Sequence, residues 1–134
     1  MYKTLKVGDK EYHLEYSVEA FMTRYTNDEG KSENHVMPLL RLANSADDNI
    51  ATAFELPNAV AHALYAGLLR HHGNTKRGDK SITSVEEAAE LAFEIIEENE
   101  DNELGSWSAL LNICTEQMTE DGFFEKLGGK TAKA

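Results

Sequence analysis

The chain is poor in cysteine, proline and long apolar runs. Its 134 residues include a single cysteine, Cys114, and two prolines. One thiol cannot form an internal disulfide, which is typical of proteins in a reducing compartment. No apolar run approaches the roughly 18 residues of a membrane-spanning helix. Residues 1–7 also lack the basic and apolar regions of a signal peptide. We therefore expect a soluble, intracellular protein that does not contact membranes.

Sequence motifs of enzymes and of cofactor-binding proteins are also missing, including the P-loop, G-x-G-x-x-G, G-x-S-x-G and C-x-x-C. The best candidates for metal ligands are the adjacent His71 and His72, with Glu86 and Glu87 downstream. Adjacent residues on a helix point about 100° apart, and the i, i+4 spacing of H-E-x-x-H is absent. The pair therefore indicates the polar end of a helix rather than a metal site.

The remaining polar candidates do not indicate chemistry either. His62 forms no recognised ligand spacing with Glu55 or Asp48. Cys114 lies among apolar residues at helical spacing, where a thiol behaves as a small hydrophobic group. The acidic stretch 97–103 lacks the ordered ligands and the glycine of an EF-hand loop. We predict a protein that is not an enzyme and has no catalytic, cofactor-binding or metal-binding residues.

Positive charge is missing from residues 81–125, which contain thirteen acidic residues and no Lys or Arg. This segment is the source of the formal net charge of −11. Its field repels phosphate backbones, so direct binding to nucleic acid is not expected. The same field would attract a basic partner and speed the encounter. A charge run of this kind also occurs simply as a solvated helix face.

The first residues predict a β-hairpin over 3–16. Apolar and polar residues alternate on both sides of the turn at Gly8-Asp9-Lys10, as the positions of Leu5, Val7, Tyr12 and Leu14 illustrate. A lone hairpin is only marginally stable in water, so it must pack on the rest of the chain or pair with another chain. The hairpin edge is therefore also a candidate site of homo-oligomer formation.

Helical spacing and turn residues predict the elements that follow the hairpin. In chain order we expect a helix from Ser17 to about Asn27, a polar loop over 28–35, a helix from Pro38 to about Ser45, a break at Asp47-Asp48-Asn49, a short turn carrying Ile50 and Phe54, and the longest helix from Pro57 to Gly73. The alanine-rich residues 59–66 place this longest helix at the centre of the core. Gly67 within it would allow a close helix crossing.

A basic, flexible linker is expected over 73–82, followed by two more helices. Thr83 or Ser84 can cap the first of them, because each has a Glu three residues on. We expect its buried stripe to comprise Val85, Ala88, Ala89, Ala92 and Ile96, and its last turn near Glu100 to fray. The final helix begins at Gly105-Ser106 and ends at Gly122. The fold class is therefore α+β, mainly α: an N-terminal hairpin and about five helices in a compact bundle.

A single domain is expected over 1–126, with the helices within 17–122 and a flexible tail over 127–134. Large apolar residues cluster towards its C-terminal end, in a region rich in acids. A surface of this kind suits a partner helix or an extended segment. The candidate partner-binding residues are Trp107, Leu111, Met118, Phe123 and Phe124.

Three segments, in order, resemble the tail assembly chaperones of long-tailed, siphovirus-type bacteriophages and prophages. Residues 7–17 are similar to the hairpin of the type G-K-x-Y-x-L with which those proteins often open. Residues 64–68 match their L-x-A-G-L segment, and residues 81–89 match the following T/S-x-E-E helix. The resemblance covers residues 3–98.

The resemblance implies a non-enzymatic role in phage tail assembly, located in the host bacterial cytoplasm and absent from the mature virion. Proteins of this family bind the tape measure protein, keep it soluble and help to recruit tail tube subunits. The expected partners are therefore the tape measure protein and the tail tube protein. The resemblance assigns no catalytic residue.

The charge pattern leaves a second role open. An acidic decoy or inhibitor would mimic nucleic acid through the face formed by residues 81–125 and would bind a basic protein in a salt-sensitive way. A chaperone that covers apolar stripes would bind through contacts that depend less on salt.

Overall fold

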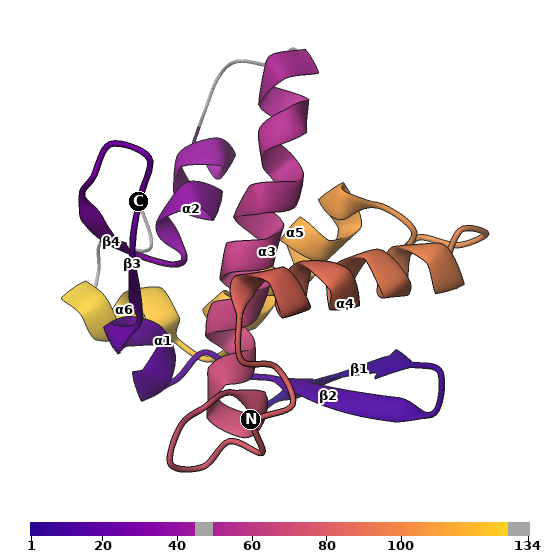
Figure 1. Cartoon of the computed structure of the whole chain (residues 1–134), viewed down its shortest axis with the longest axis horizontal. Helices are drawn as coiled ribbons and strands as arrows, with labels where there is room; N and C mark the ends of the chain where they lie inside the picture. Colours follow the sequence, from indigo (N-terminus) through magenta and orange to yellow (C-terminus); the bar gives the residue numbers. More distant parts are fainter. Residues whose placement is uncertain (45–49, 129–134) are drawn as a thin grey trace.

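The computed structural model describes residues 1–44 and 50–128, and its fold is α+β, mainly α, as predicted. This part of the chain contains six helices and two two-stranded antiparallel sheets. A long central helix runs through the molecule, and the other elements are arranged around it (Figure 1). The predictions made for Ser45, for Asp47-Asp48-Asn49 and for residues 129–134 lie outside the described residues.

The N-terminal hairpin is confirmed. Strand β1 (Lys3–Val7) pairs with β2 (Lys10–Leu14), in a register that places Leu5 opposite Tyr12. Gly8 lies in the turn with a φ of 62°, a conformation that glycine adopts without strain. The alternate residues Leu5, Val7 and Leu14 are buried. The hairpin therefore packs on the helices rather than standing alone.

A second hairpin replaces part of the first predicted helix and of the polar loop. Helix α1 (Val18–Met22) ends well before Asn27 and is followed by strand β3 (Arg24–Thr26), which pairs with β4 (Ser32–Asn34). The side-chain Oδ1 of Asn27 accepts hydrogen bonds from the backbone N–H of Glu29 (2.9 Å) and of Lys31 (3.0 Å), which shapes the intervening turn. The predicted helix over 17–27 is therefore wrong beyond Met22, because this turn favours strand pairing over helix continuation.

Helix α2 (Met37–Ala43) carries Pro38 in its first turn, as predicted. Helix α3 (Ile50–His72) begins earlier than predicted and contains Pro57 in its interior. Proline lacks an N–H and therefore removes one helical hydrogen bond, yet the helix continues on both sides of it. The predicted start at Pro57 is wrong, and the expected short turn at Ile50 and Phe54 is the first part of α3. Its predicted end at Gly73 is confirmed.

The central position predicted for α3 is confirmed, because it packs against α2, α4, α5 and β2. Gly67 makes a close approach possible, but to the hairpin rather than to another helix. The Gly67 carbonyl accepts a hydrogen bond of 2.8 Å from the backbone N–H of Glu15. The side chains of Leu14 and Tyr16, which are fully buried, fill the space that a side chain at Gly67 would need.

The linker between α3 and α4 (Val85–Glu98) folds back on the end of α3. The backbone N–H groups of Asp79 and Ile82 donate to the carbonyls of His71 (3.1 Å) and His72 (2.9 Å). The backbone hydrogen bonds therefore hold the linker against the end of the helix, where the sequence predicts a flexible segment. Figure 1 shows α4 crossing α3, with the β1–β2 hairpin alongside it.

The capping prediction for α4 is confirmed, since the Ser84 hydroxyl accepts from the N–H of Glu87 at 3.1 Å. The buried stripe is rotated from the predicted one and comprises Ala88, Leu91, Ala92 and Ile95. At the C-terminal end, the Glu98 carboxylate accepts a hydrogen bond of 2.9 Å from the N–H of Gly8. This contact ties the last turn of α4 to the hairpin turn.

Helix α5 (Trp107–Glu120) begins after Ser106 and ends before Gly122, which has a φ of 68°. A further short helix, α6 (Phe123–Gly128), follows directly. The prediction that the helices lie within 17–122 is therefore wrong at the C-terminal end. So is the prediction of a flexible tail that starts at residue 127, because Leu127 and Gly128 belong to α6. Phe123 anchors this helix, since its ring is buried and stacks on Phe21 with ring centroids 4.3 Å apart.

Asp121, at the end of α5, links this helix to the segment that follows the N-terminal hairpin. One carboxylate oxygen accepts from the backbone N–H of Tyr16 (2.8 Å), and the other accepts from the side chain of Gln117 (3.0 Å). We predict that Asp121→Ala lowers the free energy of unfolding by about 2 kcal/mol, because it leaves the N–H of the buried Tyr16 without its acceptor. Urea denaturation measures the loss, and Glu120→Ala, at an exposed neighbouring position, is the control. Equal midpoints for the two variants would contradict the prediction.

Candidate protein-binding groove

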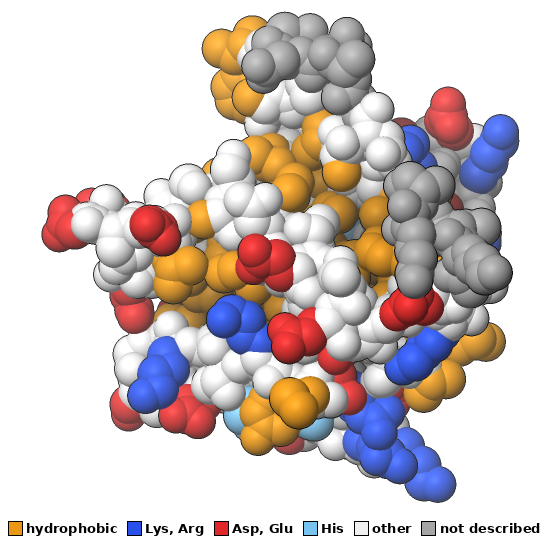
Figure 2. Space-filling model, turned by 180° about the vertical axis from the view of Figure 1, so that it is seen from behind, with side chains coloured by type: hydrophobic (Ala, Val, Ile, Leu, Met, Phe, Trp, Pro, Cys, Tyr) orange, Lys and Arg blue, Asp and Glu red, His pale blue; other side chains and the backbone are white. Residues whose placement is uncertain are grey.

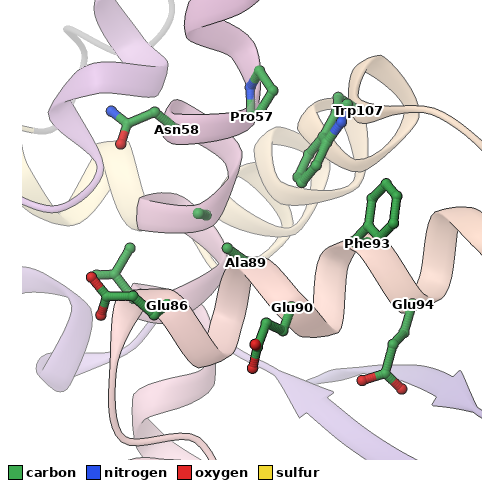
Figure 3. Close-up of a pocket in the computed structure, with 10 residues that line it drawn as sticks. Pro57, Asn58, Glu86, Ala89, Glu90, Phe93, Glu94 and Trp107 are labelled. Atoms are coloured by element: carbon green, nitrogen blue, oxygen red, sulfur yellow. The ribbon is translucent and has the colours of Figure 1, made fainter.

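An open groove of about 730 Å³ lies between α3, residues 85–94 of α4 and the start of α5. Figure 3 shows Pro57 on α3 at one side and the rings of Phe93 and Trp107 at one end. Figure 2 shows the face of the molecule opposite to that of Figure 1, where hydrophobic side chains also reach the surface, with charged side chains among them. The groove is lined by Pro57, Asn58, Ala61, Val85, Glu86, Ala89, Glu90, Phe93, Glu94 and Trp107.

Helix α4 presents two parallel rows of side chains to the groove. Val85, Ala89 and Phe93 follow one another at intervals of four residues and form an apolar row. Glu86, Glu90 and Glu94 follow at the same interval, one position on, and form an acidic row. In Figure 3 the carboxylates of Glu90 and Glu94 point away from Pro57 and Trp107, so the acidic row forms the outer edge of the groove.

The local structure explains how these rows come to face the groove. The cap at Ser84 starts α4 at Val85, and the small residue Ala88 and the larger Leu91 and Ile95 turn inward towards the core. Phe93 consequently faces outward, with 51% of its surface exposed. The Ser106 hydroxyl accepts from the N–H of Ala109 at 3.1 Å and starts α5, so that Trp107 lies in the first turn of α5, at the end of the groove.

The chemical character of the groove is simple. Apart from Asn58, its floor and walls are apolar, and the charged side chains that line it are all carboxylates. Such a surface can hold an apolar row of another protein and attract cationic side chains to its edge.

The five residues predicted to bind a partner do not form one surface. Met118 and Phe123 are buried in the core and are not available to a partner in this structure. Leu111 and Phe124 are half-buried and pack against the core. Only Trp107 of the five lines the groove. The rest of the groove surface comes from α3 and α4.

His71 and His72 have separate partners, as expected from their adjacent positions. The Nε2 of His71 lies 2.8 Å from a carboxylate oxygen of Glu15. The Nε2 of His72 accepts from the backbone N–H of His13 at 2.8 Å, and burial lowers the pKa of His72. Both rings therefore fasten the hairpin to the end of α3. Within residues 1–44 and 50–128, no group of three or more His, Cys, Asp or Glu side chains is arranged to hold a metal ion.

A second aromatic cluster surrounds His35 and His62, whose ring centroids lie 5.2 Å apart. Tyr25 packs against both rings, and Tyr65 covers His35 at 4.8 Å. Burial lowers the pKa of His35 to about 4 and also lowers the pKa of His62. These two imidazoles are therefore neutral packing groups at pH 7. Among the described residues, His62 and Glu55 belong to no group of three or more potential ligands that could hold a metal ion, and Asp48 lies outside those residues.

Cys114 is fully buried, and burial raises the pKa of its thiol to about 11. A thiol of this kind is almost entirely protonated at neutral pH and is a poor nucleophile. Its neighbour Tyr16 is also buried and donates its hydroxyl proton to the carbonyl of Ala63 at 2.8 Å. Cys114 therefore packs as a core residue on the inner face of α5, as predicted from its apolar neighbours.

Of the two aromatic residues that line the groove, Phe93 is the one that sequence reasoning missed. The signal was present, because a large aromatic residue between Glu90 and Glu94 does not fit a purely solvated helix face. The predicted stripe assigned Val85 and Ala89 to the core, whereas the structure turns α4 so that both line the groove. This rotation depends on how α4 packs on α3, which the period of the sequence alone does not specify.

No family model, curated protein or solved structure matches this chain. In the part of the chain that the structure describes, no helix is both long and apolar enough to cross a membrane.

Proposed function

We propose that this protein is a non-enzymatic phage tail assembly chaperone, which binds the tape measure protein and helps to recruit tail tube subunits. The observation that carries the proposal is the open apolar groove with its acidic edge, taken together with the sequence resemblance. A long helical client with exposed apolar rows would aggregate alone. A small acidic partner would cover such a row and contribute negative charge to the complex.

Co-expression with the tape measure protein of the same phage tests this role. We predict that the soluble fraction of the tape measure protein rises several-fold when this chain is present, and that the complex survives high salt, because apolar contacts dominate it. An unrelated acidic protein of similar size is the control. Equal solubility with and without this chain, with no complex on gel filtration, would refute the proposal.

Purification of the chain from the same cells distinguishes the chaperone role from the acidic-decoy role. A decoy acting through residues 81–125 would capture a basic nucleic-acid-binding protein of the host and release it as salt is raised. The groove favours the chaperone, because a nucleic-acid mimic needs only charge, whereas here Phe93 presents 51% of its surface to solvent beside the acidic row. Self-association through the hairpin edge stays a prediction, which gel filtration of the purified chain tests.

A further inference from the structure

We propose that the α3–α4 groove is the docking site for a basic amphipathic helix of the partner protein, a helix whose apolar row is flanked by Lys or Arg. This inference rests on the proposed function for the identity of the partner, and on the geometry of the groove for the partner's chemistry. It names a surface that differs from the predicted C-terminal one, since only Trp107 belongs to both.

The spacing of the apolar side chains on α4 suits a helical partner. The apolar row from Val85 to Phe93 spans about 12 Å along the helix axis, since a helix rises 1.5 Å per residue. Two to three turns of a partner helix would cover this length. The i, i+4 rows of a second helix pack into the grooves between such rows, which is the usual geometry of helix contacts. Pro57 and Ala61 form the opposite wall of the groove and present little side-chain bulk.

Charge is the second argument. The acidic row of Glu86, Glu90 and Glu94 runs parallel to the apolar row and is exposed. No Lys or Arg lines the groove to neutralise it. Carboxylates at intervals of four residues repel one another on a helix, a small penalty that a cationic partner removes. A helix with Lys or Arg one position from its apolar row would place its cations opposite these carboxylates.

Exposure is the third argument. Phe93 is half-exposed, and Trp107 at the same end of the groove is only partly buried. Aromatic residues in an apolar depression with a polar edge are typical of the residues that dominate binding energy at protein interfaces. Docking would bury both rings.

The unique tryptophan of the chain provides the measurement. The probe is a synthetic helical peptide of Leu, Ala and Lys, free of Trp and Tyr, with Leu at i, i+3, i+4 and i+7 and Lys beside the Leu row. A peptide with Glu in place of every Lys is the charge-reversed control. We expect the Lys peptide to shift the Trp107 emission to the blue in a saturable titration of the full chain. We expect the Glu peptide to bind at least tenfold more weakly.

Two pairs of variants locate the site. Phe93→Ser should weaken binding of the Lys peptide at least tenfold, whereas Phe54→Ser, at an exposed phenylalanine outside the groove, should leave it unchanged. Glu90→Lys with Glu94→Lys should abolish the preference for the Lys peptide. Glu116→Lys with Glu120→Lys, exposed on α5, makes the same change in net charge outside the groove and should preserve that preference. Circular dichroism confirms that each variant is folded.

The outcomes separate the groove from the chaperone role. Binding that is equal for both peptides, or equal for Phe93→Ser and Phe54→Ser, overturns the docking site. Co-expression of Phe93→Ser with the tape measure protein then tests the role by itself. If Phe93→Ser keeps the tape measure protein as soluble as the natural chain does, the chaperone role stands and the groove is rejected as its binding site. If the natural chain binds the Lys peptide specifically but does not raise the solubility of the tape measure protein, the groove stands and that client is rejected.

Discussion

Replacing Gly67 by alanine should lower the free energy of unfolding by about 2 kcal/mol, the cost of a severe collision less the gain from the usual preference of helices for alanine. A methyl group at this position would collide with Leu14 and would lie 2.7 Å from the Cζ of Tyr16. Both side chains are fully buried and cannot move into solvent. Overpacking of this kind costs roughly 1–3 kcal/mol, and the gain in helix propensity of about 1 kcal/mol offsets only part of a severe collision.

A double-mutant cycle with Leu14→Ala tests the cause. Leu14→Ala alone is destabilising, because it removes a buried side chain. If the collision explains the effect of Gly67→Ala, then that substitution will be less damaging in the Leu14→Ala background, since space has been made for the new methyl group. Urea denaturation of the four proteins measures the coupling. Strictly additive effects would show that the loss arises elsewhere.

Lowering the pH from 7 to 5 should destabilise the protein by about 2 kcal/mol through His35 alone. Its folded pKa of about 4 lies below the ordinary value of 6.5, so the unfolded chain binds the proton more tightly. The contribution of His35 to stability is therefore complete above pH 6.5 and is lost as the pH falls towards 4. The accumulated loss at pH 4 is about 3 kcal/mol. His62 and His72 have lowered pKa values for the same reason and act in the same direction.

The variant His35→Gln isolates the contribution of His35 to the pH dependence of stability. It should be less stable than the natural chain at pH 7, and the dependence of its unfolding free energy on pH between 7 and 5 should be flatter by about 2 kcal/mol. Carboxylates affect the pH dependence of stability mainly at lower pH. Glu33 is an example, because the hydrogen bond from Arg41 is the main cause that lowers its pKa to about 2. Parallel curves for the two proteins, from denaturant titrations at each pH, would contradict the assignment to His35.

Local signals in the sequence predicted several boundaries correctly. The alternation around Gly8 predicted the first hairpin, and the Ser84 and Ser106 caps and the glycines at 73 and 122 marked helix ends. Each of these features depends on residues close together in the chain. The acidic character of residues 81–125 was likewise visible from composition.

Features that depend on distant contacts were missed or displaced. The segment 24–34 carries turn residues that fit either a loop or a hairpin, and the pairing of β3 with β4 decides between them. Pro57 resembles a helix start locally, but the helix extends back to Ile50. Phe123 and Phe124 were predicted to bind a partner, whereas the stacking of Phe123 on Phe21, about 100 residues earlier, makes this region part of the core.

By itself, the sequence determined an α+β, mainly α chain with an N-terminal hairpin, a central alanine-rich helix and an excess of acid after residue 80. Only the tertiary structure decided the rotation of α4. Its inward side is set by packing against α3 and β1, so Leu91 and Ile95 enter the core while Val85, Ala89 and Phe93 remain outside it. The physical reason is that a helix with a broad apolar face can pack on its neighbours at several rotations about its own axis. Which angle is realised depends on the shapes of the partners, and here that choice places Phe93 beside Trp107.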